Sequence, residues 1–126
     1  MLPPVQRQRY IGINMRIHTD HNGVAVNAVA ALADGADVQG HQYVVAIGAK
    51  SVTIDFQRGP VPANGVNGLT NEALLAILIH RTQHLNGKFA SAENVRAIDH
   101  MEQALMCFEV RTARRLLRGV EGQNVT

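Results

Sequence analysis

The sequence predicts an α+β fold, in which a small N-terminal antiparallel β-sheet is followed by a C-terminal antiparallel two-helix hairpin. Three observations lead to this prediction. Residues 10–17 and 51–56 alternate apolar and polar side chains, which is the period of a half-buried strand. Residues 70–118 carry apolar side chains at helical spacing. Between these regions, residues 59–65 contain two prolines and two glycines, which interrupt any regular ladder.

The boundary segment divides the chain into a small β-sheet region, 1–63, and a helical hairpin, 64–126, expected to carry the ligand-binding and oligomerisation surfaces. A chain of 126 residues suffices for one compact domain, or for a sheet unit and a helical unit that share a core. Aromatic residues make up 4% and Trp is absent, so the core is built from Ala, Val, Leu, Ile and Met.

In the sheet region, residues 43–47 precede the second alternating segment, and Gly48, Ala49 and Lys50 between them look like a hairpin turn. Residues 25–33 are rich in Ala and Val, which fit a helix or a strand equally well. The fold of residues 20–40 therefore stays open.

The first helix is expected at about 70–86. Thr70 caps it, Glu72 lies near its positive end and Gly87 ends it. Its apolar stripe is formed by four leucines, which are Leu74, Leu75, Leu78 and Leu85.

The second helix is expected at about 91–118, with Ser91 as its N-cap and Gly119 just past its end. Its core positions follow coiled-coil spacing and are Ile98, Met101, Leu105 and Phe108.

The short link at 86–90 makes the two helices antiparallel, and because the second is longer, residues 109–118 project beyond the first. The projecting end carries Val110, Leu116, Leu117 and Val120, which are unfavourable in water, so another subunit or the sheet should cover them.

The lone cysteine, Cys107, excludes an intrachain disulfide and is expected to pack in the core. No apolar run reaches the roughly 18 residues of a membrane span, and the first ten residues lack the apolar segment of a signal peptide. We therefore expect a soluble, cytoplasmic protein.

Four arginines, Arg111, Arg114, Arg115 and Arg118, fall within eight residues that contain no acid, although the net charge is only +2. Arg111 with Arg115, and Arg114 with Arg118, are i, i+4 pairs whose guanidinium forks suit phosphate oxygens. A basic last turn also complements the helix dipole while staying solvated, so spacing alone leaves both interpretations open.

Catalysis and metal binding find little support. His80 and His84 have zinc-ligand spacing with His100 on the facing helix, but Arg81 beside them would repel a cation and the glutamate of a zinc protease is missing. No phosphate-binding glycine loop and no nucleophile elbow is present. We expect a protein that is not an enzyme and holds no metal or cofactor.

Three stretches of the sequence resemble a phage family. The run TIDFQRGP at residues 53–60, followed by GVNGLTNEALLAILIHRTQHLNGKFASAEN and RTARRLLRGVEG, is similar to the anti-Thoeris signal sponges. Their helical hairpin is shared with smaller anti-CBASS sponges. The resemblance covers about residues 51–123, whereas the first fifty residues match only as a small sheet region.

The resemblance implies an anti-defence protein that sequesters cyclic nucleotide immune signals without cleaving them. The signal is glycocyclic ADP-ribose of Thoeris, and for some members also the cyclic dinucleotides or trinucleotides of CBASS. Family members are dimers, or hexamers built from dimers, so the chain itself is an expected partner. We expect neither a membrane nor a nucleic acid as a partner.

The same resemblance assigns ligand-binding residues. Arg111 and Arg115 match the two arginines that grip phosphate, and Asn94 matches a polar contact near the start of the second helix. The family's aromatic base-stacking position holds His84 here, and a neutral imidazole stacks on a purine while a protonated one attracts phosphate. By position alone, His84 is a surface residue and Asn94 a first-turn polar residue.

Asn94 and Arg111 lie seventeen positions apart, or roughly 25 Å at 1.5 Å per helical residue. One pocket holding all four residues therefore needs two subunits, packed antiparallel about a two-fold axis with two identical sites.

In a hexamer, a further cyclic-nucleotide site is expected at Lys88, Phe89, Thr112 and Arg118. By position alone, these are turn and cap residues.

Two rival functions remain. A nucleic-acid-binding helical adaptor would use the arginines on a strand, but the balanced charge and few aromatic residues argue against it. In a purely structural phage protein, the arginines are solvated and nothing is captured.

Overall fold

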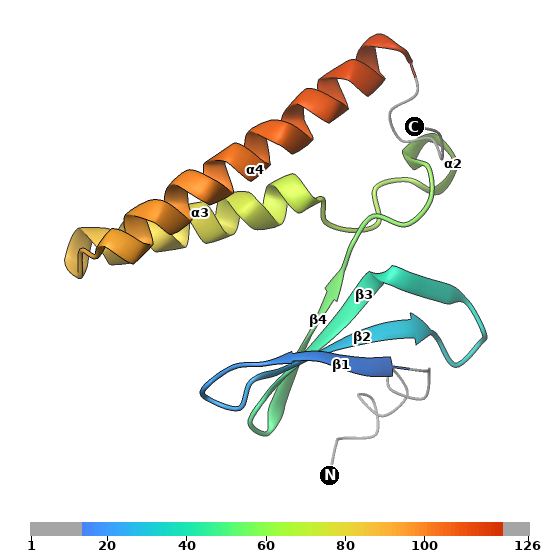
Figure 1. Ribbon diagram of the computed structural model, residues 1–126. Coiled ribbons are helices and arrows are strands. Elements are labelled where there is room, and N and C mark those ends of the chain that lie inside the picture. The colour runs from blue at the N-terminus through green and yellow to red at the C-terminus, as the bar shows by residue number, and fades with distance from the viewer. Residues whose placement is uncertain (1–13, 120–126) are drawn as a thin grey trace. The chain divides into compact units, whose positions relative to one another are not determined.

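The computed structural model describes residues 14–119. The chain forms two compact units that divide between Arg58 and Gly59. The first contains a four-stranded antiparallel sheet and the second a helical hairpin (Figure 1). The predicted α+β class, with the sheet preceding the hairpin, is confirmed.

The sheet has the strand order β1-β2-β3-β4, so each strand pairs with its neighbour in sequence. Every pairing is antiparallel. The strands are β1 (Asn14–Thr19), β2 (Ala25–Ala31), β3 (Asp37–Ile47) and β4 (Lys50–Asp55).

A two-residue turn joins β3 to β4, because Ile47 already pairs with Lys50. Gly48 opens the turn with φ +59°, the left-handed conformation that a type II′ hairpin turn requires at its first position. The hairpin predicted here is confirmed, with Lys50 belonging to the strand.

The segment that the sequence left open between helix and strand is β2. It lies between two strands, and its Val29 packs with Val38 and Val44 of β3 in a buried cluster that Leu32 borders. These aliphatic side chains are the core of the sheet unit. Neighbouring strands on both sides therefore decide a conformation that local propensity does not.

The first predicted strand is only partly as expected. Its residues 10–13 lie outside the described part of the chain, and β1 continues two residues beyond the predicted end at residue 17. The expectation of a half-buried strand was wrong, because all six β1 side chains are exposed, Met15 at 66%. β1 is an edge strand, paired with β2 alone in the described sheet.

The β1–β2 turn is organised by Asp20. One oxygen of its carboxylate accepts hydrogen bonds from the backbone N–H of Val24 at 3.0 Å and of Asn22 at 2.8 Å. These bonds, the one from Val24 most of all, stabilise the ionised form and lower the pKa of Asp20 below its usual value.

The proline- and glycine-rich segment contains one short helix, α2 (Val61–Asn64), which begins after Pro60. Gly59 just before it has φ +77°, and a Cβ there would meet Asn64 Nδ2 at 2.5 Å. The sequence predicted the interruption of the ladder but not this helical turn.

Helix α3 (Asn71–Lys88) begins where predicted, with the Thr70 hydroxyl accepting a hydrogen bond from the Ala73 N–H at 3.1 Å. The expected end at Gly87 was wrong, because the helix runs through that glycine to Lys88. A helical hydrogen bond from the Phe89 N–H to the Leu85 carbonyl, at 2.8 Å, outweighs the poor helix propensity of glycine.

Helix α4 (Ala92–Leu117) has the predicted cap, since the Ser91 hydroxyl accepts a hydrogen bond from the Asn94 N–H at 3.0 Å. Arg118 follows as C-cap and Gly119 has φ +70°, the left-handed conformation expected just past a helix end.

The two helices make a narrow contact. Ile79 is the buried residue of α3, and the four heptad positions of α4 are only half-buried. Gln83 Nε2 donates to Glu102 Oε1 across the hairpin at 3.3 Å.

Two packing predictions for the helices were wrong. Leu78 and Leu85 of the expected stripe are exposed, and so is Cys107. Each helix meets a single neighbour inside the unit, so side chains only slightly off the contact line face outward.

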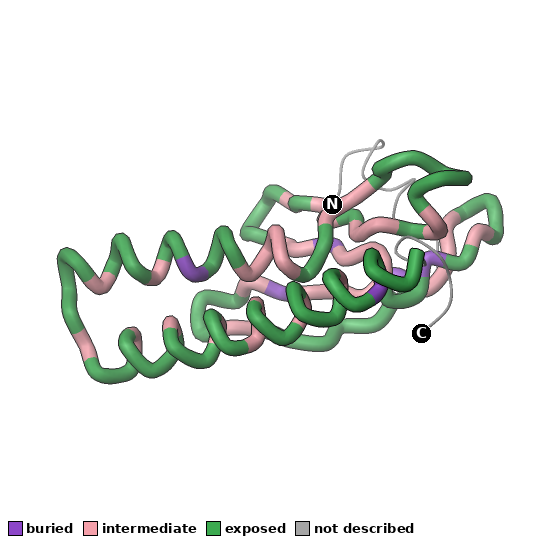
Figure 2. The backbone as a smooth tube through the Cα atoms, turned by 90° about the horizontal axis from the view of Figure 1, so that it is seen from above, coloured by how far each residue is buried: buried purple, intermediate pink, exposed green. Residues whose placement is uncertain are grey.

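Helix α4 has 26 residues and α3 has 18, and α4 continues past the start of α3 (Figure 1). The predicted projection of the second helix is therefore present. Most of both helices is exposed (Figure 2). Within residues 14–119, no helix combines the length and apolarity needed to cross a lipid bilayer.

Candidate functional site

The turn between α3 and α4 is held by polar side chains. Asn86 Oδ1 accepts a hydrogen bond from the Ser91 N–H at 3.0 Å, and Asn94 Nδ2 donates to the Phe89 carbonyl at 3.4 Å. Asn94 therefore has a structural role in the turn. Its amide group also carries an oxygen, which is a hydrogen-bond acceptor. Phe89 itself is 76% exposed.

His84 and Lys88 lie one helical turn apart on α3, and both are exposed. Together with Asn94 and Phe89 they form the tip cluster of the hairpin. The structure thus brings His84 and Asn94, predicted for one site, to the same end of the hairpin, along with Lys88 and Phe89, predicted for another.

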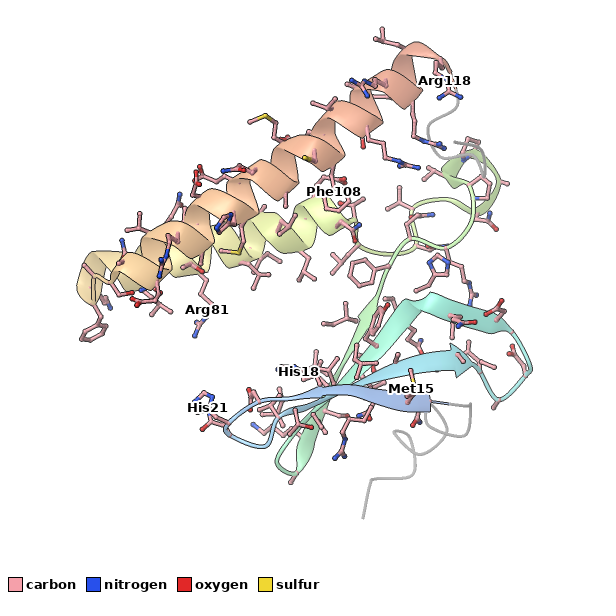
Figure 3. All side chains as sticks on the ribbon, viewed as in Figure 1. Met15, His18, His21, Arg81, Phe108 and Arg118 are labelled. Carbon is pink, nitrogen blue, oxygen red and sulfur yellow. The ribbon has the colours of Figure 1, made fainter. Side chains whose placement is uncertain are left out.

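The remaining predicted residues lie towards the opposite end of α4. Arg111, Arg114 and Arg118 are exposed, and Thr112 is half-buried. Figure 3 shows Arg118 at the end of α4, beyond Phe108. We refer to Arg111, Arg114, Arg115 and Arg118 as the arginine cluster.

Arg115 differs from the expectation of two guanidiniums displayed side by side. It is 4% exposed, whereas Arg111, its i, i+4 partner, is exposed. Arg115 also takes part in an interaction within the chain, so it is not an unpartnered cation. In the protomer, the outward charge of the cluster comes from the other three arginines.

The tip cluster and the arginine cluster are not brought together within one protomer. Asn94 and Arg111 belong to a single uninterrupted helix, so seventeen residues at about 1.5 Å each separate them by about 25 Å. A ligand touching both residues must therefore contact two copies of α4.

An apolar strip runs along the side of α4 away from Arg111. Met106, Val110, Ala113 and Leu117 fall within about 60° of one another at 100° per residue, and all four are exposed, Leu117 at 89%. Sequence reasoning named Val110 and Leu117 but missed Met106. The i, i+4, i+7, i+11 spacing was the signal that could have found it.

The arrangement of His, Cys, Asp and Glu side chains bears on metal binding. Across residues 14–119, no three His, Cys, Asp or Glu side chains are grouped so that they can bind a metal ion. His80, His84 and His100 thus do not form such a group.

Comparison with known proteins gives two matches. The family model described as "Acb2/Tad1, hairpin domain" matches residues 49–113. A protein named Thoeris anti-defense 1, from Bacillus phage SBSphiJ7, is 49% identical over 74 residues. That match covers 58% of this chain and 52% of the relative, so the similarity spans about half the relative's length.

The matched residues 49–113 begin at the β3–β4 turn, include all of α3 and most of α4, and contain the N-caps of both helices, the tip cluster and Arg111. They make up more than half of the 126 residues. The chain therefore belongs to the Acb2/Tad1 hairpin family.

Proposed function

We propose that this protein is a non-catalytic sponge that binds and sequesters cyclic nucleotide immune signals, and so prevents them from activating their effectors. The first ligand is glycocyclic ADP-ribose of Thoeris, and cyclic dinucleotides or trinucleotides of CBASS are further ligands. The protein acts in the cytoplasm of the infected bacterium. Membership of the family and the name of the phage relative support an anti-defence role.

The observation that carries the binding mode is the separation of Asn94 from Arg111 along one straight helix. We propose that His84 and Asn94 of one protomer and Arg111 and Arg115 of a second line one cavity. Two antiparallel copies of α4 about a two-fold axis create two such cavities. The exposed Leu116 and Leu117 at the end of α4 are then covered by the partner, which removes apolar surface from water.

The charges suit a phosphate-bearing ligand. Arg111 offers an exposed guanidinium fork, which binds phosphate oxygens in a bidentate manner. His84 supplies a flat ring that stacks on a base. No catalytic group is required, because sequestration depends only on affinity and on protein in excess over free signal.

The second predicted site combines the exposed Lys88 and Phe89 of the tip with Thr112 and Arg118. Lys88 and Phe89 lie just before the start of α4, whereas Thr112 and Arg118 lie towards its other end. We propose that they bind a cyclic dinucleotide or trinucleotide where dimers associate further into a hexamer.

Ligand titration tests the function directly. Purified protein is titrated with glycocyclic ADP-ribose and with cyclic dinucleotides and trinucleotides, and the bound ligand is released by heat and identified by chromatography. We expect stoichiometric binding and intact ligand. Altered ligand would indicate an enzyme, and preference for oligonucleotides with a steep loss of affinity in salt would indicate a nucleic-acid adaptor.

Arg111→Ala should weaken capture of glycocyclic ADP-ribose by about 10-fold or more, the effect of losing a charge-assisted contact. Arg16→Ala is the matched control, because Arg16 is equally exposed but lies on β1, outside the matched hairpin. Equal affinity of both variants and the unaltered protein would contradict a role for Arg111.

Mixing variants tests whether two protomers share the cavity. His84→Glu and Arg111→Glu each place a negative charge at an exposed position and should abolish capture alone. Dissociated and reassembled one to one, they form mixed dimers with one intact cavity, which restores about a quarter of the sites. A cavity within a single protomer predicts no recovery.

A further inference from the structure

Gly87 is a helical glycine that the usual backbone roles of glycine do not explain. It is exposed in the last turn of α3, and it is not among the glycines with positive φ. The residue that caps the C-terminus of α3 is Phe89, with φ −134°, so Gly87 does not supply the left-handed conformation that often ends a helix. The backbone of α3 therefore does not need a glycine at position 87.

Packing within the protomer does not need this glycine either. A Cβ built at position 87 would meet no heavy atom within 4 Å. Glycine nevertheless disfavours a helix relative to alanine. Natural sequences tend to break such local rules at functional sites, and glycine is the residue that allows a ligand to approach a backbone closely. The open space at position 87 is thus available to a molecule from outside the protomer.

This open space lies beside His84. Residues three and four positions apart are neighbours on a helix, and a side chain leans back over the turn that precedes it. A side chain at position 87 would therefore lie over Gln83 and His84. Gln83 donates its hydrogen bond to Glu102 of α4, whereas His84 is exposed. The missing side chain leaves the imidazole of His84 open on the side of Gly87.

From these observations we infer that Gly87 is a specificity-determining residue, which keeps room beside the His84 ring for the flat base of a cyclic nucleotide. The inference rests on the proposed function, in which His84 stacks on a base. Stacking requires access to the face of a ring, and one additional methyl group in a filled site is already unfavourable. Gly87 thus acts on the base of the signal, and Arg111 acts on its phosphates.

Binding of glycocyclic ADP-ribose to Gly87→Ala tests this role. The ligand should bind about 10-fold more weakly than to the unaltered protein, because the methyl group occupies space that the base needs. Without ligand, the variant should unfold at the same or a higher temperature, so that weaker binding does not reflect a damaged fold. Ala76→Ser is the matched control, since it adds one heavy atom at another exposed position of α3 and should leave the affinity unchanged.

A double-mutant cycle tests whether Gly87 acts through His84. His84→Ala removes the ring, so the addition of Gly87→Ala should then weaken binding by less than about 2-fold. In Arg111→Ala, where the ring is intact, Gly87→Ala should keep its effect of about 10-fold. Equal losses in the two backgrounds would overturn the inference.

Two further results separate this inference from its alternatives. If the unaltered protein binds no cyclic nucleotide, the proposed function fails and the inference with it, whereas equally tight binding by Gly87→Ala overturns the inference alone. Sedimentation of Gly87→Ala without ligand should match that of the unaltered protein. A shift towards monomer would show that a second protomer, and not the ligand, occupies the space beside Gly87, and would also overturn the inference.

Discussion

Gly87 lies inside a helix, although glycine more often ends one. It lies inside the last turn of α3, and a Cβ at this position would meet no heavy atom within 4 Å. A glycine inside a helix costs backbone entropy. In the protomer, neither a turn nor a close approach of other atoms requires a glycine at this position.

Gly87→Ala should therefore stabilise the protein by about 0.5–1 kcal/mol, because alanine restricts the unfolded chain and favours the helix. Thermal unfolding measures this as a rise in Tm. Gly65→Ala is the control, since that site is equally open but has φ +71°, where alanine is strained. A fall in Tm for Gly87→Ala would show that the glycine is needed for contacts outside the protomer.

Asp20 provides a prediction on pH. The backbone hydrogen bonds from Val24 and Asn22 lower the pKa of its carboxyl group in the folded state. The stability that these bonds supply is thus present above the unfolded pKa, and is lost as the pH falls through the lower folded pKa. A carbon NMR titration of the Asp20 carboxyl should give a midpoint below 3.8, the ordinary pKa of an aspartate side chain. A midpoint above that value would contradict the turn geometry.

At the scale of elements, the hairpin depends on local caps as much as on packing. Ser91 is held through its own N–H by Asn86, and its hydroxyl caps α4 through the Asn94 N–H. Both bonds join neighbours in sequence, so the turn between the helices is specified locally.

Ser91→Ala should destabilise the protein by about 1 kcal/mol, the usual cost of removing a serine N-cap. Ser91→Thr is the control, because it retains a hydroxyl that accepts the same hydrogen bond. Chemical denaturation of both variants measures the difference. Equal free energies of unfolding for alanine and threonine would rule out the cap as a source of stability.

The elements also show which features the sequence determines. The caps at Thr70 and Ser91 were predicted because a hydroxyl bonds an amide three residues later, and the caps need nothing else. β2 was left undecided because Ala and Val suit either period, and its neighbouring strands decide it. Cys107 was misplaced because the burial of a helical face depends on how many neighbours cover it.

For the candidate site, the sequence identified residue types and their spacing. It correctly placed Asn94 and Arg111 far apart on one helix, because a regular rise per residue fixes that distance. The burial of Arg115 was beyond its reach, since spacing gives the direction of a side chain but not the segment that covers it. The roles of the four proposed ligand-binding residues stay predictions.

At the scale of the whole molecule, the exposed end of α4 predicts self-association. Leu117→Glu should weaken it strongly, because a charge replaces a leucine, 89% exposed in the protomer, that the proposed dimer would cover. Analytical ultracentrifugation at several concentrations measures the shift towards monomer. Met15→Glu is the control on the exposed β1 strand, outside the matched hairpin. If Leu117→Glu associates like the unaltered chain, the end of α4 is not the interface.

Thermal stability should also depend on protein concentration. In the described protomer, α3 buries Ile79 and α4 buries Arg115, which is a small interior for two long helices. Folding that is completed by association gives a Tm that rises with total protein, typically by several degrees over a 100-fold range. A Tm independent of concentration over that range would show that the protomer is stable alone.

Because the hairpin buries so few side chains, the amount of active protein should depend on how much chain has been synthesised. Molecules that fold only as they meet accumulate slowly in active form at first, and then in proportion to the square or a higher power of the amount synthesised. Under the proposed function, the free signal would therefore stay high until the amount of chain passes a threshold, and would then fall steeply.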